Sequence, residues 1–258
     1  MGCIMVKKWE PDNFALQENS VWSFPDRGEW ATHKGDYRGN WSPYVPRNLI
    51  LRYSSGGERI LDPFVGSGTT LIEAKLLCRD AIGVDINPNA LKIAKDTTEF
   101  VHEGADGKIY LKEGDSKNLR FIPNDSIDLA CLHPPYADII RYSENISDDI
   151  SHLPPTDFIE AMRLVAKEMY RVLKGGKICA ILIADVRKKG LIVSISFQTM
   201  QVFQDEGFQL KDIVIKQQHN CKMTNKWKMA GKQRNFLLIE HEYLFILKKS
   251  VKHKEFHM

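Results

Sequence analysis

Cysteine is scarce in this 258-residue chain, and its five cysteines lie far apart. The sequence has neither a C-x-x-C pair nor a His–Cys cluster, which excludes the usual zinc sites and the disulfide frameworks of small secreted proteins. No apolar run approaches the ~20 residues that a membrane span needs, and no basic segment followed by an apolar stretch opens the chain. These absences predict a reduced, cytoplasmic protein with no metal site and no membrane partner.

A strong excess of one charge is also missing, because 36 Lys and Arg face 33 Asp and Glu for a net charge of +3. The charge is nevertheless uneven along the chain. From residue 216 onward ten basic residues face three acidic ones, so this section carries +7 while the first 215 residues carry −4. Such a section is typical of an edge that binds a polyanion, and equally of a solvated lysine-rich surface.

The order of the expected elements predicts one α/β domain. Residues 1–48 contain four tryptophans and many turn formers without a regular period, which indicates an irregular arm. In residues 49–250 short apolar runs alternate with amphipathic stretches, which favours a mainly parallel sheet covered on both faces. A basic insertion around 217–236 joins the last two strands without an obvious helix, so one of them should run antiparallel. The expected strands are 59–62, 81–85, 108–112, 127–132, 178–184, 209–216 and 243–247, and the expected helices are 69–77, 89–102, 157–173 (closed by Gly175-Gly176) and 194–203.

Two segments indicate a nucleoside site. The stretch from Asp62 to Thr70 reads DPFVGSGTT and joins an expected strand to an expected helix. Its glycines let the backbone approach a ligand, and the start of the helix offers free N–H groups. Asp85 ends the next expected strand, where a carboxylate can accept both hydroxyls of a ribose. Because no Lys-Ser/Thr follows the glycines and the third dinucleotide glycine is missing, the ligand should be a nucleoside without a pyrophosphate. A lone G-x-G, however, also occurs in many tight turns.

A third segment, His133-Pro134-Pro135-Tyr136, directly follows the apolar strand 127–132. Two prolines fix an extended, rigid backbone without donors of its own. Carbonyl oxygens and the flanking side chains are then presented at the carboxyl end of a strand, where open α/β sheets bind ligands. By itself this tetrapeptide is compatible with an ordinary loop. Behind the two nucleoside signals, in this order, it indicates a catalytic site.

Together these segments resemble the amino-methyltransferases of DNA, which modify N4 of cytosine or N6 of adenine. The resemblance covers residues 20–250, and it implies a class I (Rossmann-like) methyltransferase fold with a seven-stranded, mainly parallel sheet containing one antiparallel strand. Residues 39–43 and 47–50 resemble the family's segment before the cofactor loop, so the arm 1–48 is expected to complete the cofactor pocket. The resemblance assigns the binding of S-adenosyl-L-methionine to Asp62, Pro63, Phe64, Gly66, Ser67, Gly68, Thr69, Thr70, Asp85, Ile86, Asp115 and Ser116.

The resemblance also implies a mechanism. The lone pair of an exocyclic amino group is delocalised into its ring, so the site must hold both amino hydrogens. His133 and the Pro134 carbonyl would accept them, and Tyr136 would stack on a base flipped out of the duplex. The family has Asp, Asn or Ser where this chain has His133, which accepts a hydrogen bond only when neutral. Activity should therefore fall below about pH 6.5, and the non-acidic first residue favours N4 of cytosine over N6 of adenine.

Double-stranded DNA is the expected partner, in a restriction–modification setting with a cognate restriction endonuclease, and the chain is expected to act as a monomer or a homodimer. Three alternatives stay open: an adenine-N6 DNA methyltransferase, an RNA base methyltransferase, and a nucleic-acid-binding protein with this fold but weak catalysis. A tryptophan among lysines suits nucleic-acid contact, although a solvated loop would look the same. The expected contact residues are Arg141, Lys222, Lys226, Trp227, Lys228, Lys232 and Arg234.

Overall fold

The computed structural model describes residues 8–137, 142–143, 146–219, 229 and 231–251. Within them the strands of the main sheet are β1 (Val21–Trp22), β2 (Arg59–Asp62), β3 (Asp80–Asp85), β4 (Ile109–Glu113), β5 (Ile127–Leu132), β6 (Leu173–Ile183), β9 (Phe208–Gln217) and β10 (His241–Lys249). Strands β7 (Val186–Lys188) and β8 (Leu191–Val193) form a separate hairpin. The helices are α1 (Tyr44–Tyr53), α2 (Thr69–Leu76), α3 (Pro88–Thr98), the 3₁₀ helix η2 (Ile150–His152), α4 (Pro155–Val172) and α5 (Ile195–Asp205).

The main sheet has the strand order β1-β9-β10-β6-β5-β2-β3-β4. Among the described strands of the main sheet only β10 runs antiparallel to its neighbours, β6 and β9, and the other pairings of this sheet are parallel. The expected seven strands with one antiparallel member are therefore confirmed. The two residues of β1, which pair with Ile215 and Lys216 of β9, add an eighth strand that the sequence pattern did not reveal.

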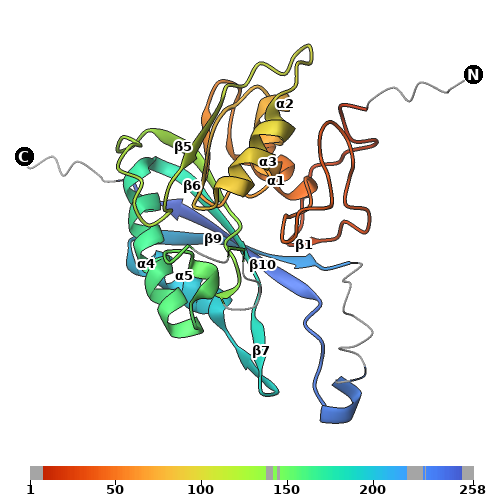
Figure 1. The fold of residues 1–258 in the computed structure, drawn as a ribbon, viewed down its shortest axis with the longest axis vertical. Coiled ribbons are helices and arrows are strands. Elements are labelled where there is room, and N and C mark those ends of the chain that lie inside the picture. Colours follow the sequence, from red (N-terminus) through yellow and green to blue (C-terminus); the bar gives the residue numbers. More distant parts are fainter. Residues whose placement is uncertain (1–7, 138–141, 144–145, 220–228, 230, 252–258) are drawn as a thin grey trace, which may run out of the picture.

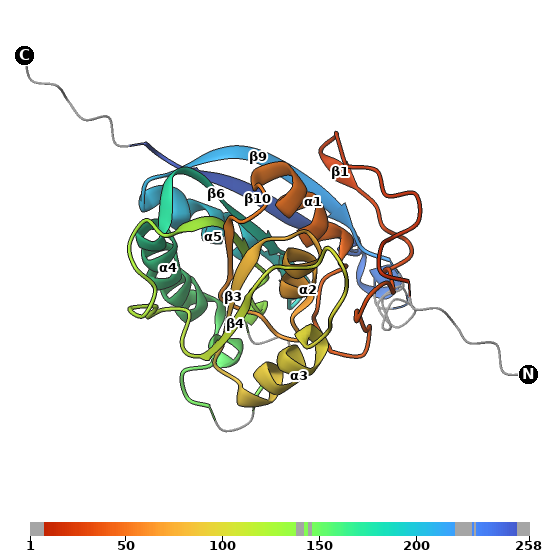
Figure 2. The same ribbon diagram turned by 90° about the horizontal axis from the view of Figure 1, so that it is seen from above.

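Helices cover both faces of the sheet (Figures 1 and 2), with α4 and α5 on one face and α1, α2 and α3 on the other. The apolar stripe of α4, which includes Phe158, Met162, Val165 and Met169, is fully buried. Strand β5 is buried along its whole length, as expected of a central parallel strand. None of the helices in the described part of the chain is long and apolar enough to span a membrane.

Several expected element boundaries were wrong, and the ends of two helices show why. Helix α4 ends at Val172, and Gly175-Gly176 lie inside β6 rather than behind the helix. There the pairing of β5 with β6 shifts register, and Gly176 takes a φ of +79° that favours glycine. Helix α3 ends at Thr98 instead of residue 102. At this end the Thr98 hydroxyl donates to the Ala94 carbonyl at 2.7 Å.

The arm is irregular only as far as Pro43, because α1 begins at Tyr44, before the expected boundary at residue 48. Burial of Trp22, Trp30 and Trp41 fixes the arm to the body, as expected of anchoring tryptophans. Underneath it lies the fully buried carboxylate of Glu73 on α2. This carboxylate accepts hydrogen bonds from Trp30 Nε1 at 2.7 Å and Arg47 Nη1 at 2.9 Å, and it lies 2.7 Å from the His33 ring.

Candidate functional site

A cleft of about 790 Å³ opens at the carboxyl ends of β2, β3, β4 and β5. The segments that follow these strands meet there because parallel strands end at the same edge of a sheet. Tyr37, Asn40 and Trp41 of the arm close the cleft from one side. Tyr142 and the residues around Asp149 line it as well. The cleft is thus built from six separate parts of the chain.

Ten of the twelve expected cofactor residues line this cleft: Asp62, Pro63, Phe64, Gly66, Ser67, Thr69, Asp85, Ile86, Asp115 and Ser116. The other two lie just behind it. Gly68 caps α2 with a φ of +85°, and a Cβ there would come within 3.3 Å of the Ala94 backbone on α3. Thr70 donates its hydroxyl hydrogen to the Asp62 carboxylate. Of the tetrapeptide, His133 and Pro135 line the cleft, whereas Pro134 and Tyr136 do not.

Two carboxylates brace the glycine loop. Asp85 Oδ2 accepts the Gly66 N–H and Oδ1 accepts the Asn87 N–H, both at 2.9 Å. Each oxygen keeps lone-pair capacity for a ligand. Burial raises the pKa of Asp85, although these N–H groups oppose the shift. The more deeply buried Asp62 has its pKa raised by burial to about 7 and accepts the Phe64 N–H at 3.0 Å.

A buried polar chain stands behind His133. Its Nε2 atom lies 2.8 Å from the Tyr136 hydroxyl oxygen, and this hydroxyl donates to the carboxylate of Glu242 on β10. Lys216 on β9 donates to the same carboxylate at 2.8 Å. On the other side Trp41 stacks on the imidazole, with ring centroids 5.4 Å apart and planes 13° apart. The sequence pattern did not reveal Glu242 and Lys216, because their meeting depends on the pairing of β9 with β10.

Burial lowers the pKa of His133 to about 4, and the charge of Lys216 adds to this effect while Glu242 opposes it. The expected loss of activity below about pH 6.5 is therefore wrong for this residue. An imidazole with this pKa stays neutral, and able to accept a hydrogen bond, down to about pH 4. The neighbouring Cys131 is fully buried inside β5, and its burial raises the pKa of its thiol well above the usual value. This is the behaviour of a packing residue rather than of a nucleophile.

A comparison with protein families decides the class of this chain. The sequence model of one family, the N6/N4 methyltransferases described as DNA methylase, matches residues 6–96 and 127–257. The chain belongs to the DNA methylase family.

Curated relatives of this chain include the Type II methyltransferases M2.DpnII from Streptococcus pneumoniae and M2.LlaDCHI from Lactococcus lactis subsp. cremoris. The first is 47% identical over 91 residues, which are 35% of this chain and 34% of that protein. The second is 41% identical over 86 residues, or 32% and 31%. A tRNA (guanine(10)-N2)-dimethyltransferase from Methanothermobacter thermautotrophicus is 32% identical over 101 residues, or 39% and 29%. The matched parts thus span about a third of the length of these relatives.

Solved structures agree on the fold. The chain superposes with a TM-score of 0.55 on a SAM-dependent methyltransferase from Methanosarcina mazei, at 15% identity over 79% of this chain and 98% of that one. TrmN from Thermus thermophilus gives a TM-score of 0.54 at 17% identity, over 82% and 50% of the two chains. The class I methyltransferase fold expected from the sequence is therefore confirmed.

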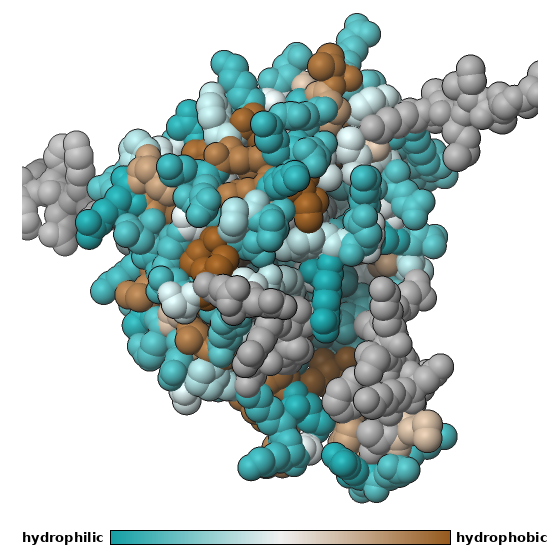
Figure 3. Space-filling view, in the orientation of Figure 1, coloured by the Kyte–Doolittle hydropathy of each residue, from teal (hydrophilic) through white to brown (hydrophobic). Residues whose placement is uncertain are grey.

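The expected nucleic-acid contacts are only partly open to inspection, because Arg141, Lys222, Lys226, Trp227 and Lys228 lie outside the described residues. Lys232 and Arg234 are exposed on a short helical turn between β9 and β10. The turn and the β7–β8 hairpin follow the carboxyl ends of β9 and β6, at the edge where the cleft opens, and both project from the body (Figure 1). Figure 3 shows hydrophilic side chains at the ends of these projections.

Arg187 on β7 connects the two projections. Its guanidinium donates to the Leu237 carbonyl at 2.9 Å and lies 4.6 Å from the centroid of the Phe236 ring.

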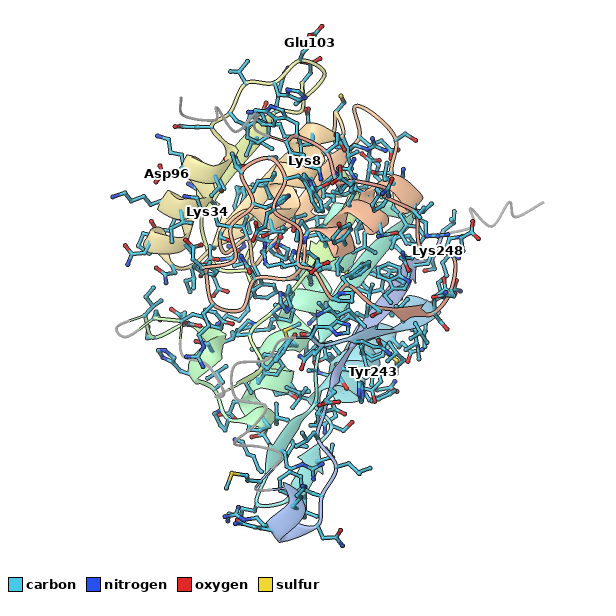
Figure 4. All side chains as sticks on the ribbon, turned by 90° about the vertical axis from the view of Figure 1, so that its right-hand side faces the viewer. Lys8, Lys34, Asp96, Glu103, Tyr243 and Lys248 are labelled. Atoms are coloured by element: carbon cyan, nitrogen blue, oxygen red, sulfur yellow. The ribbon has the colours of Figure 1, made fainter. Side chains whose placement is uncertain are left out.

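A second cavity, of about 910 Å³, lies between the arm and α3 and shares Tyr37, Ser67 and Thr69 with the cleft. Lys34 and Asp96 line it, and Figure 4 shows both on the same side of the molecule. Among the described residues no group of three His, Cys, Asp or Glu side chains is placed to hold a metal ion.

Proposed function

We propose that this DNA methylase transfers the methyl group of S-adenosyl-L-methionine to an exocyclic amino group of a base in double-stranded DNA. The observation that carries the proposal is that the glycine loop, Asp85 and His133 line one cleft. A methyl donor held by the loop and a base held at His133 would therefore share one cavity. Family membership and the Type II methyltransferase relatives support the same reaction.

The residues of the cleft fit this cofactor. Asp85 would offer carboxylate lone pairs to ribose hydroxyls, and Asp115 and Ser116, which line the same cleft, are proposed to contact the adenine. Gly66 has a φ of +49°, and a Cβ there would come within 3.1 Å of the Tyr37 ring, so glycine is favoured at this point of the loop. When bound, S-adenosyl-L-methionine supplies an electrophilic methyl group on its sulfonium.

His133 and Pro134 would hold the acceptor base. An amino nitrogen attacks only when its lone pair leaves the plane of the ring, so each of its hydrogens needs an acceptor. The neutral imidazole of His133, which lines the cleft, would accept one hydrogen, and the Pro134 carbonyl is proposed for the other, although Pro134 does not itself line the cleft. The bound cofactor would supply the methyl group, the residues of the cleft would hold the amino nitrogen toward it, and the displaced amino proton would pass to water. The rate then comes from alignment and preorganised acceptors.

Cytosine N4 is the proposed target, because the first residue of the tetrapeptide is not acidic. Stacking of Tyr136 on the base stays a prediction, since its hydroxyl is held by Glu242 and the residue does not line the cleft. Contacts from Lys232 and Arg234 to DNA phosphates are proposed from their exposure at the cleft edge. A restriction–modification setting is proposed from the Type II relatives.

The test is methyl transfer from isotopically labelled S-adenosyl-L-methionine to mixed-sequence duplex DNA and, separately, to total RNA. We expect label in the DNA and none above background in the RNA. The variant His133→Ala should bind the cofactor as the wild type does and lose transfer. Label confined to RNA would refute DNA as the substrate.

Methylation of an amino group in RNA is the second candidate. One observation favours it, namely the 32% identity over 101 residues to a tRNA (guanine(10)-N2)-dimethyltransferase. The same acceptors would serve a guanine N2 amino group, and the RNA arm of the same experiment decides between the two.

A further inference from the structure

A buried ion pair lies next to the catalytic segment. Glu242 and Lys216 are directly paired across β10 and β9, and their side chains are only 8% and 14% exposed. Removing two charges from water is costly, and their attraction repays this cost only when further hydrogen bonds complete the arrangement. Here the further bond comes from the Tyr136 hydroxyl, which in turn contacts His133. The pair is therefore linked to the residue proposed to hold the target base.

The direction of each hydrogen bond between Lys216, Glu242, Tyr136 and His133 follows from which of these groups carries a proton. Burial alone would raise the pKa of Glu242, but Lys216, His133 and Tyr136 lower it below its usual value, so the group is a carboxylate that only accepts. Burial raises the pKa of the Tyr136 phenol well above 10, so the phenol keeps its proton and donates it to Glu242. The phenol oxygen is then left as an acceptor for the His133 Nε2 atom, 2.8 Å away.

The two nitrogens of His133 are thereby distinguished. A neutral imidazole carries one proton, and a donating Nε2 leaves Nδ1 as the acceptor. In the described part of the chain no hydrogen bond engages Nδ1, and this atom is not among the buried polar atoms without a partner. The side chain is 13% exposed and lines the cleft, and Trp41 fixes the plane of its ring.

We infer that Glu242, braced by Lys216, is a positioning residue that acts through Tyr136 to hold His133 as the Nε2-protonated tautomer, leaving Nδ1 to accept a hydrogen of the target amino group. This inference rests on the proposed function for its catalytic meaning. Its structural half, the tautomer, is independent of any substrate.

The first test measures the tautomer directly. Nitrogen-15 NMR of the protein labelled in histidine, at pH 7 and without substrate, separates protonated from bare ring nitrogens, and His133→Asn identifies the signals of this residue. We expect a protonated Nε2 and a bare Nδ1 in the wild type. In Glu242→Gln the amide can donate to the phenol oxygen, which turns the phenol proton toward Nε2 and moves the imidazole proton to Nδ1. A bare Nε2 in the wild type, or an unchanged tautomer in Glu242→Gln, would overturn the inference.

The second test measures turnover. Glu242→Gln should lower kcat by roughly 10²-fold while KM for the cofactor and for DNA stays within about twofold. Tyr136→Phe removes the hydroxyl that links His133 to Glu242 but leaves the Glu242–Lys216 pair in place, and it should lower kcat likewise. Glu240→Gln is the matched control, because the same charge is removed from an exposed position two residues away, and it should behave as the wild type.

The outcomes separate the two proposals. A changed tautomer with unchanged kcat in Glu242→Gln would refute the positioning role. A wild type that methylates no nucleic acid would refute the proposed function, while the NMR result would still decide the tautomer. Thermal midpoints of the variants show whether a loss of kcat comes from unfolding, and Tyr136→Phe keeps the test decisive if Glu242→Gln does not fold.

Discussion

The attachment of the arm to α2 gives a prediction whose size follows from the structure. The Glu73 carboxylate is fully buried and serves Trp30 and His33 through Oε1 and Arg47 through Oε2. In Glu73→Gln the remaining amide oxygen can still accept hydrogen bonds from Trp30 and His33. The amide NH₂ would then face the Arg47 guanidinium, and two donors cannot form a hydrogen bond. Breaking a buried pair in this way costs about 3–5 kcal/mol.

We expect the lower end of that range, because Arg47 keeps a second carboxylate partner, Glu10. A loss of about 3 kcal/mol in a chain of this size lowers the melting temperature by roughly 6–12 °C, at roughly 2–4 °C per kcal/mol. Thermal unfolding followed by circular dichroism measures this shift. The control is Glu99→Gln, which removes an exposed carboxylate, 3.6 Å from Lys95 and 63% exposed, and should change stability by less than about 0.5 kcal/mol. Equal melting temperatures for the two variants would refute the argument that Glu73 anchors the arm.

Three further outcomes are expected. Because the pKa of His133 is lowered to about 4, kcat should stay flat from about pH 5.5 to about pH 8 with respect to this group. Lys216→Met removes a charge that lowers this pKa, so its acid limb should move to higher pH, and an unmoved limb would contradict the assignment. Asp85→Asn should weaken cofactor binding by about 10–100-fold in calorimetry, since an amide NH₂ would face one of the two backbone N–H groups that the carboxylate accepts; unchanged affinity would exclude Asp85 from the site. Replacing Lys232 and Arg234 by Ala should reduce the salt dependence of DNA binding by about two phosphate contacts, and an identical salt slope would remove this turn from the interface.

The sequence pattern predicted the elements that carry strong local signals. Strand β5 is an apolar run that ends at a double proline, and its bounds agree with those expected. The glycine loop and Asp85 each lie at the end of a parallel strand, so the rule that carboxyl ends share an edge predicts that they line one cleft. These are features that a few neighbouring residues determine.

Other features depend on pairings far apart in the chain and left no local signal. In the sequence Lys216 and Glu242 look like ordinary charged residues of two strands. Only the position of β10 between β9 and β6 shows that they meet. The ordinary pKa of histidine led to the wrong pH expectation, because the burial of His133 by Trp41 and the β9–β10 pair is a property of the folded chain. Helix α1 was missed because Pro43 and Pro46 suggest a turn, although proline is well tolerated at the start of a helix.

The position of the transferred methyl group tests the central claim most directly. Duplex DNA incubated with the protein and deuterated-methyl S-adenosyl-L-methionine is digested to nucleosides, and mass spectrometry locates the label on the base. We expect a labelled exocyclic nitrogen, as N4-methylcytosine, and N6-methyladenine would keep the mechanism while correcting the base. Label on a ring carbon, as in 5-methylcytosine, would contradict the proposed reaction, because the roles proposed for His133 and the Pro134 carbonyl would hold an amino group and would not activate a carbon.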